Sequence, residues 1–333
     1  MKTWICLFCL IFPFVILARA EEEKSIKAKE IIPSLIEDLF KPVKHPWVVQ
    51  AVLEMPTYSF YVGGPSVHGV SYQPNVAPRL GTRILWKEWG TMLALSLPIP
   101  KSEQTRRGDS SQTNMMINNY WRQYATDFYY QKFRGFYVSS PLTELQVSKP
   151  GLYPQLPDAQ VFNYGFNLYR SIRPQTYSLK AAFNQTEFQL KSGGSLLHTV
   201  FYNHLEINVG DRLLPGSDPN SLKDLPNLDK GKFNTLGAGY GYGYMYIHEN
   251  FFASGLITIA PAIQHQDIQR VDNRHSTSVS WAGKGTVNLS TGWNPNEYVG
   301  GVKILVDSLY SRVSDNEFWS SLLSLQLFYG ARF

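Results

Sequence analysis

The 333-residue chain carries a net charge of +5, contains two cysteines and is 14% aromatic, with 20 Tyr, 19 Phe and 8 Trp. Both cysteines, Cys6 and Cys9, lie in the first twenty residues, so a chain that loses this segment is not a disulfide-crosslinked extracellular domain. The same loss removes Lys2 and Arg19 and leaves 29 basic against 26 acidic residues, a net charge of +3. That excess is too small to indicate binding to nucleic acid.

Residues 1–20 have the pattern of a secretory signal peptide. One lysine precedes an uninterrupted apolar run from Trp4 to Leu17, and an A-x-A triplet ends the segment at Ala20. The run of about 14 residues is shorter than the roughly 20 that a membrane-spanning helix needs. We therefore expect export and cleavage after Ala20, and no later stretch is apolar enough for a spanning helix.

The following segment, residues 21–45, is expected to lie in the periplasm and lead into the main domain. Several of its apolar residues have helical spacing, which predicts a short amphipathic helix. Insertion of this segment into the main domain as a plug is the alternative, but no residue ties it there. These apolar residues are Ile31, Ile32, Leu35, Ile36, Leu39 and Phe40.

Residues 46–333 alternate between apolar and polar positions almost throughout, which indicates β-strands. Residues 162–168, 177–183 and 279–293 show the pattern well. The alternating segments run for about 9 to 15 residues, whereas strands of soluble sandwiches cluster near 5 or 6. Long strands with aromatic ends predict a transmembrane barrel whose apolar faces contact lipid.

The stretch LGAGYGYGYMYI, residues 236–247, places four tyrosines on one face of a strand and four glycines on the other. A phosphate-binding glycine loop would need its glycines in a turn before a helix, and no helix follows here. Glycines along an inner face allow close approach of other groups. This stretch therefore favours a small barrel or an internal plug.

The fold predicted is all-β, an antiparallel up-and-down transmembrane barrel of about 12 strands, with 10 to 14 allowed. Short turns are expected at Lys132–Gly135, His248–Asn250 and Asn294–Asn296, among others, and long loops at Leu142–Asp158 and elsewhere. This assignment has a parity conflict, because it puts the long loop at 142–158 on the side of the short turns. One strand is therefore split or missed, and we expect the error at Met55–Val70.

Catalytic groups are scarce. His198, His204 and Glu206 alternate along one predicted strand and are assigned to its inward face, where Glu206 would orient His204 for proton transfer. Polar residues normally line a barrel interior, so these three residues are weak catalytic candidates. A single His beside a Glu in the predicted turn at 248–250 is not a metal site, and neither a metal nor a cofactor is expected.

Charged side chains are expected inside the barrel. They either form ion pairs across a narrow lumen or make a slightly cationic constriction that selects anions. The sequence does not separate a plugged lumen from a conducting one. The residues assigned to the lumen are Arg79, Arg83, Asp127, Lys180, Lys284 and Lys303.

The last strand ends on an aromatic residue, Phe333, with Tyr329, Leu327 and Leu325 at alternate positions before it. It resembles the terminal signal that the barrel-assembly machinery of bacterial outer membranes reads. The resemblance implies this machinery as a partner, together with outer-membrane lipid and lipopolysaccharide. A small solute is a further candidate ligand.

Two internal stretches, DFYYQKFRGFYVSSP at 127–141 and YSLKAAFNQTEFQLKSGGSLL at 177–197, are similar to the domain of unknown function DUF4421. The similarity extends over residues 47–333 and implies a Gram-negative outer-membrane barrel. It brings no catalytic or binding residues. The expected function is a non-enzymatic role as a structural protein, a binding protein or a narrow, porin-like pore. The alternatives are an outer-membrane hydrolase or acyltransferase that acts on lipid or peptide, and a soluble secreted β-protein.

Overall fold

A computed structural model describes residues 39–64, 67–140, 151–210, 228–270, 274–313 and 316–333. The predicted signal peptide and amphipathic helix lie outside these residues, apart from the end of the helical pattern at Leu39 and Phe40. Among the described residues, no helix is both long and apolar enough to cross a membrane. The elements are β1 Phe40–Pro42, β2 Trp47–Gly64, β3 Val67–Gln73, β4 Arg79–Trp86, β5 Trp89–Ser96, α3 Lys101–Arg107, β6 Ser111–Tyr120, β7 Tyr124–Ser140, β8 Gln155–Ser171, α4 Leu179–Phe183, β9 Glu187–Gln189, β10 Gly193–Asn208, β11 Leu228–His248, β12 Phe251–Arg270, β13 His275–Trp293, β14 Tyr298–Val313 and β15 Asn316–Arg332.

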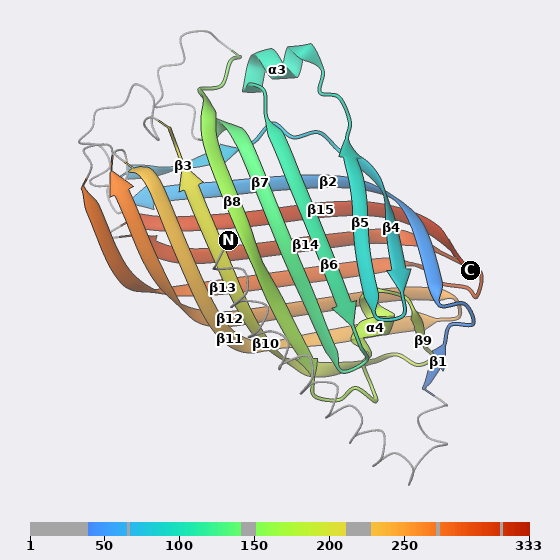
Figure 1. Cartoon of the computed structure of the whole chain (residues 1–333). Helices are drawn as coiled ribbons and strands as arrows, with labels where there is room; N and C mark the ends of the chain where they lie inside the picture. Colours follow the sequence, from blue (N-terminus) through green and yellow to red (C-terminus); the bar gives the residue numbers. More distant parts are fainter. Residues whose placement is uncertain (1–38, 65–66, 141–150, 211–227, 271–273, 314–315) are drawn as a thin grey trace, which may run out of the picture.

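The strands form a closed antiparallel barrel (Figure 1). The last strand pairs with the first wall strand over sixteen residue pairs, from Glu317↔Gly63 to Arg332↔Val48, which closes the ring. β3 and β4 run one after the other along β2, with only residues 74–78 between them. If β3 and β4 are counted as one strand, the wall has twelve strands in the described part of the chain. The predicted fold class and strand number are confirmed.

The two ends of the barrel differ. At the short-turn end, connections such as 87–88, 121–123, 249–250 and 294–297 join neighbouring strands. At the opposite, long-loop end, the β5–β6 connection carries α3 (Figure 1). One long segment, residues 172–192 with α4 and β9, lies at the short-turn end and turns inward.

The parity conflict of the sequence-based assignment has two causes. The turn predicted at Lys132–Gly135 is wrong, because these residues lie inside β7. The strand predicted at Tyr177–Phe183 is also wrong, because Leu179–Phe183 form the short helix α4. With both changes, the connection that follows β7 belongs to the long-loop end.

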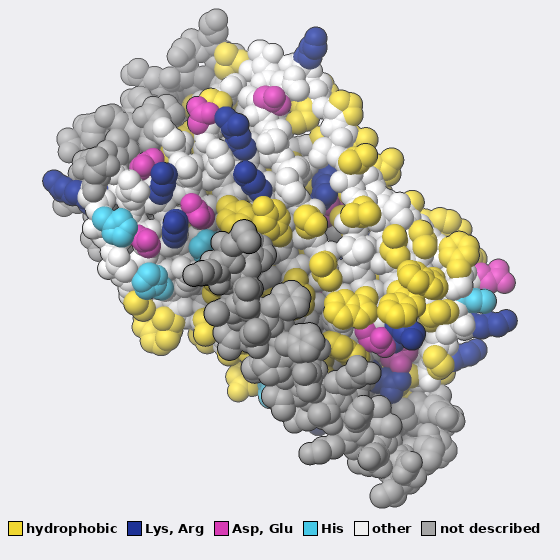
Figure 2. All heavy atoms as spheres, viewed as in Figure 1, with side chains coloured by type: hydrophobic (Ala, Val, Ile, Leu, Met, Phe, Trp, Pro, Cys, Tyr) yellow, Lys and Arg dark blue, Asp and Glu magenta, His cyan; other side chains and the backbone are white. Residues whose placement is uncertain are grey.

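The outer surface of the wall carries a broad apolar band (Figure 2). Side chains that alternate outward are large and apolar, as at Trp281 on β13, which is 77% exposed. Tryptophans and tyrosines gather near the short-turn end, as expected for an interfacial girdle. These aromatic residues include Trp47, Trp86, Trp89, Tyr246, Trp293, Tyr298 and Tyr329.

The inward side chains form three layers along the barrel axis. An apolar cluster that includes Phe60, Phe133 and Phe318 fills the long-loop end. A second apolar cluster, which contains the whole of α4 except Lys180, fills the short-turn end. Between them lies a belt of buried polar and charged residues.

Candidate functional site

The short-turn end is filled by the inward segment 172–192, which we call the plug. Tyr177 is fully buried, and Ser178 caps the N-terminus of α4, because its hydroxyl accepts a hydrogen bond from the Ala181 amide at 3.1 Å. A Cβ atom on Gly243 would lie 2.3 Å from the Tyr177 ring. Only glycine at 243 therefore lets the plug lie directly on the wall. Burial raises the pKa of the Tyr177 hydroxyl, which stays neutral.

Ion pairs at the rim hold the plug in place. Glu187 on β9 pairs with Arg122 from the β6–β7 turn and accepts a 2.7 Å hydrogen bond from the Ser178 hydroxyl. Lys180 on α4 pairs with Glu88 of the β4–β5 turn at 2.9 Å. The plug also pairs with the start of the described chain, because β9 and β1 form a two-stranded sheet.

The long-loop end is closed by stacked aromatic rings. Phe60 and Tyr72 stack with their centroids 4.6 Å apart, and Tyr58 stacks on Phe133 at 4.7 Å. These rings come from β2, β3 and β7, which meet at this end because β3 pairs with both other strands. The lumen is thus occupied by apolar side chains on both sides of the polar belt.

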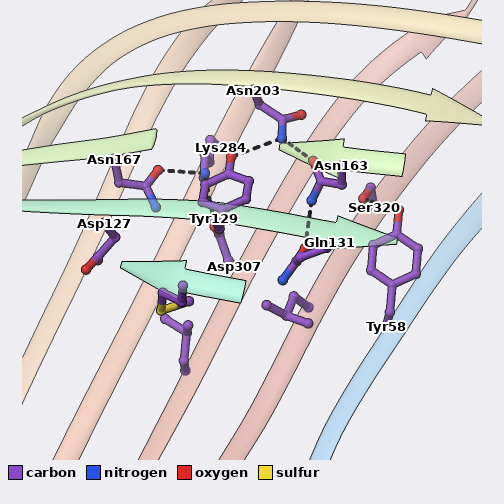
Figure 3. A pocket seen from close by; sticks show the side chains of 13 residues that line it. Tyr58, Asp127, Tyr129, Gln131, Asn163, Asn167, Asn203, Lys284, Asp307 and Ser320 are labelled. Atoms are coloured by element: carbon purple, nitrogen blue, oxygen red, sulfur yellow. Dashed lines mark hydrogen bonds and ion pairs between the residues drawn. The ribbon is translucent and has the colours of Figure 1, made fainter. Parts of the chain in front are cut away.

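The polar belt is a hydrogen-bonded network of charged, amide and hydroxyl side chains (Figure 3). The ammonium of Lys284 lies 3.0 Å from the carboxylate of Asp307 and 2.8 Å from Oδ1 of Asn167. Asp127 accepts hydrogen bonds from Tyr120 at 2.5 Å and from Asn118 at 2.6 Å. The cavity between these side chains has a volume of about 40 Å³. This volume has room for about three water molecules.

A second part of the belt is centred on Glu54. Its carboxylate pairs with Arg79 at 3.0 Å and accepts hydrogen bonds from Ser324 at 2.9 Å and Gln326 at 3.0 Å. Arg83 donates to the Gln326 side chain. Both carboxylate oxygens of Glu54 are therefore bound, which is what a buried charge requires.

The wall itself is interrupted between β5 and β6. Their ladder contains three pairs, from Trp89↔Asn119 to Thr91↔Ile117, and then ends. Beyond it the two strands diverge toward α3 (Figure 1). We call the diverging parts, residues 92–96 of β5 and 112–116 of β6, the seam.

Backbone groups of β5 face the seam. A two-residue turn at 87–88 joins β4 and β5, so Trp86↔Trp89 is a hydrogen-bonded pair and the odd-numbered residues of β5 bond to β4. The N–H and C=O groups of Met92 and Ala94 therefore point toward β6, where the ladder has no pairs. In lipid, each unpaired backbone group costs several kcal/mol.

Side chains partly replace the missing ladder. Arg79 donates from one nitrogen to the carbonyl of Ala94 on β5 at 3.2 Å and to that of Asn114 on β6 at 3.1 Å. The Thr91 hydroxyl contacts the Met116 carbonyl at 3.4 Å. Gln112 on β6 donates to the Ser96 hydroxyl on β5 at 3.3 Å. These contacts leave the Oε1 atom of Gln112 and the Oδ1 atom of Asn114 buried without a partner.

At its long-loop end the seam opens into a groove below α3, with a volume of about 330 Å³. One part of its lining is apolar and includes Val76, Leu97 and Ile99. The rest carries hydroxyl and amide groups and a single charged side chain, Asp109. The groove therefore offers hydrogen-bond partners to a polar group without a cation to hold an anion.

The candidate catalytic residues do not face the lumen. His198 is exposed and His204 and Glu206 are half-buried, while the intervening Leu205 is completely buried. The inward assignment of these three residues was therefore wrong. The His204 ring bonds to Asn234 at 2.8 Å and lies 4.0 Å from the Glu206 carboxylate, on the outer wall.

The residues assigned to the lumen divide into two groups. Arg79, Arg83, Asp127 and Lys284 are buried in the polar belt, and Lys303 reaches the Phe183 ring of the plug at 5.5 Å. The assignment of Lys180 to a lumen-facing strand position is wrong, because Lys180 lies on α4 and pairs with Glu88 at the rim. Among the described residues, no cluster of three or more His, Cys, Asp or Glu side chains is arranged to hold a metal ion.

Side chains of the final strand, β15, point alternately to the outer wall and to the interior. Leu327, Tyr329 and Phe333 are exposed on the outer wall, and Leu325 is half-buried on the same face. Phe333 also exchanges two backbone hydrogen bonds with Trp47, at 3.0 and 3.3 Å. The last residue thus belongs to the strand pair that closes the barrel.

Sequence reasoning allowed an internal plug without identifying residues 172–192 as the segment that forms it, and it missed the seam. The plug alternates like a strand, with Tyr177, Leu179, Ala181 and Phe183 apolar, so periodicity did not mark it as a helix. One feature of the sequence could have indicated the seam, namely the prolines at positions 74 and 78. The backbone nitrogen of proline has no hydrogen to donate to a neighbouring strand. These prolines mark the break between β3 and β4 beside which the seam opens.

Comparisons with known proteins identify a family. Similar solved structures include the outer-membrane protease OmpT of Escherichia coli (TM-score 0.37, 8% identity, 88% of this chain and 99% of that one). A second is the β domain of the Bordetella autotransporter BrkA, with a TM-score of 0.34 and 8% identity over 86% of this chain and 100% of that one. A third is the Pseudomonas putida toluene transporter TodX, with a TM-score of 0.28 and 10% identity over 86% of this chain and 90% of that one. No curated protein matches the sequence. The model described as Domain of unknown function (DUF4421) matches residues 40–333, and the chain belongs to this family.

Proposed function

We propose that the protein is a sealed barrel of the bacterial outer membrane with a non-enzymatic, structural or binding role. One observation carries this proposal: the plug and the aromatic layer block the lumen on opposite sides of the polar belt. Between them, Glu54 pairs with Arg79 and Lys284 with Asp307, while Asp127 and Arg83 are bound by hydrogen bonds to neutral side chains, so these belt charges are already engaged within the barrel.

The proposal includes the route to the membrane. Export would depend on residues 1–20, with cleavage after Ala20, and residues 21–45 would lie in the periplasm before β2. The exposed apolar positions of β15 that end at Phe333 would serve as the signal for the barrel-assembly machinery. The exposed apolar band would contact outer-membrane lipid and lipopolysaccharide.

A narrow pore for small solutes is the second candidate. It is favoured by the cavity of about 40 Å³ in the polar belt and by the position of the plug's ion pairs at the rim. In this version the plug would move and admit solute. Hydrolysis or acyl transfer has no comparable support, because His204 and Glu206 lie on the outer wall.

Conductance of the refolded mature protein in planar bilayers separates the two candidates. The sealed barrel predicts no current steps for the wild type, even when insertion is confirmed by heat-modifiable gel mobility. A double variant with Gly243→Val in the wall below the plug and Phe60→Ser in the aromatic layer should conduct. Stepwise currents from the wild type would overturn the sealed barrel and support the pore.

A further inference from the structure

We propose that the seam and the groove below α3 bind a single-chain amphiphile with an uncharged, hydroxyl-bearing head group, such as a monoacylglycerol. The acyl chain would lie along the outer side of the seam and the head group would enter the groove. This inference rests on the membrane location proposed above, and it is independent of whether the lumen conducts.

The outer side of the seam is suited to an acyl chain. Leu93 and Leu95 on β5 are 66% and 82% exposed, and Met115 and Ile117 on β6 are 55% and 46% exposed. These side chains flank the line along which the two strands separate. Between diverging strands, an acyl chain contacts apolar side chains on two sides instead of one, which increases its contact with the protein.

The head group is specified by the acceptors that lack donors. The Oε1 atom of Gln112, which lines the groove, is buried and unpartnered, and so is the Oδ1 atom of Asn114 on the inward face of β6 next to it. A buried acceptor without a donor is unfavourable, so a hydroxyl group that donates to it is stabilised there. The N–H groups of Met92 and Ala94, which point toward β6 across the seam, in turn require acceptors.

The charge of the groove argues against an anionic head group. Asp109 is the only charged side chain in its lining. Of the basic residues of α3, Arg106 and Arg107 are both paired with Glu103, at 3.1 and 3.3 Å, and Lys101 does not line the groove. A phosphate or carboxylate would meet Asp109 without a free cation in the lining, whereas a hydroxyl group can donate to it.

The test uses the mature protein in lipid nanodiscs and a monopalmitoylglycerol with a photoactivatable diazirine in its chain. We expect cross-links concentrated at residues 92–97 and 111–117, and competition by unlabelled monopalmitoylglycerol but not by palmitate. Ser111→Trp fills the mouth of the groove and should reduce labelling there at least fivefold. Ser276→Trp, a matched exposed serine at the same end of β13, should leave it unchanged.

A second variant, Leu97→Trp, guards against misfolding of the first, and wild-type heat-modifiable mobility is required of both. Cross-links spread evenly around the barrel, or equal labelling in the groove variants, would overturn the inference. So would stronger competition by palmitate, or cross-linked dimers joined through β5 and β6, which would make a second copy the occupant. Failure to insert into nanodiscs would overturn the membrane location along with it, whereas insertion with uniform labelling overturns only this site.

Discussion

The barrel has a continuous side and an interrupted side. On the continuous side, β10 to β15 run for 16 to 21 residues, and β12 pairs with β13 over nineteen consecutive residues. On the interrupted side, β3 to β6 run for only 7 to 10 residues, and the β5–β6 ladder has three pairs. Both sides face the same membrane, so the interrupted side must replace backbone hydrogen bonds with side-chain contacts.

The difference between the two sides supports the position proposed above for the ligand site. Long, regular ladders satisfy every backbone group and leave nothing for a ligand to bind. Both sides contain a buried ion pair and unpartnered buried polar atoms, but the interrupted side adds a broken ladder and an open groove. A sealed barrel that binds a membrane molecule would be expected to do so on this side.

The largest effect is expected from Arg79→Met. This change removes the bridge between the carbonyls of β5 and β6 and leaves Glu54 buried without its cation. We expect a loss of about 3–5 kcal/mol in the free energy of unfolding. Urea titration in detergent micelles measures it. Arg134→Met, which breaks an exposed pair with Asp158, should cost less than about 1 kcal/mol, and equal losses would contradict the bridging role.

The next effect concerns the continuous side. Lys284→Met leaves Asp307 buried and unpaired, and we expect it to cost about 3 kcal/mol. Adding Asp307→Leu removes the stranded charge and should recover most of that loss. The same urea titration tests both variants, and a double variant no more stable than Lys284→Met would show that the pair does not act as a unit.

A smaller effect is expected at the plug. Gly243→Val places a side chain against the Tyr177 ring and should destabilise the protein by about 1–3 kcal/mol through overpacking. Proteolysis should then cut within residues 172–192 more rapidly. Gly283→Val is the control, because a Cβ atom at Gly283 meets nothing within 4 Å. Similar proteolysis of both variants would contradict the close packing of the plug.

The smallest effect is expected on the outer wall. His204→Ala removes a ring contact with Tyr164, at 4.6 Å between centroids, and a hydrogen bond to Asn234. It should change the free energy of unfolding by less than about 1 kcal/mol. Esterase and peptidase assays on wild type and variant should be indistinguishable. An activity that disappears in His204→Ala would reopen the enzymatic alternative.

The sequence was sufficient for the wall and insufficient for the lumen. Lipid on one face imposes alternation on every long strand, so the strands of β8 and β13 could be read from their residues alone. The lumen obeys no single pattern, because it is apolar at both ends and polar in the middle. In β10 the inward residue is the apolar Leu205, which is buried in the layer at the long-loop end. The assumption that inward residues are polar therefore assigned its neighbour His204 to the wrong face.

The seam could not be predicted from alternation, because Leu93, Leu95 and Met115 alternate like any lipid-facing residues. Its origin lies in pairing between distant segments: β7 pairs with β6 near the short-turn end and with β3 near the long-loop end. β6 stays paired with β7 along its whole length, whereas its ladder with β5 stops at Thr91↔Ile117. Only the register of the sheet reveals it.

Residue-specific amide exchange by NMR, with the barrel in lipid nanodiscs, tests the interrupted wall most directly. The amides of Leu93 and Leu95 bond to β4, whereas those of Met92 and Ala94 point into the seam. The structure predicts slow exchange for the first pair and exchange at least tenfold faster for the second. Equal protection of all four amides would mean that β5 and β6 are fully paired, and would contradict the account.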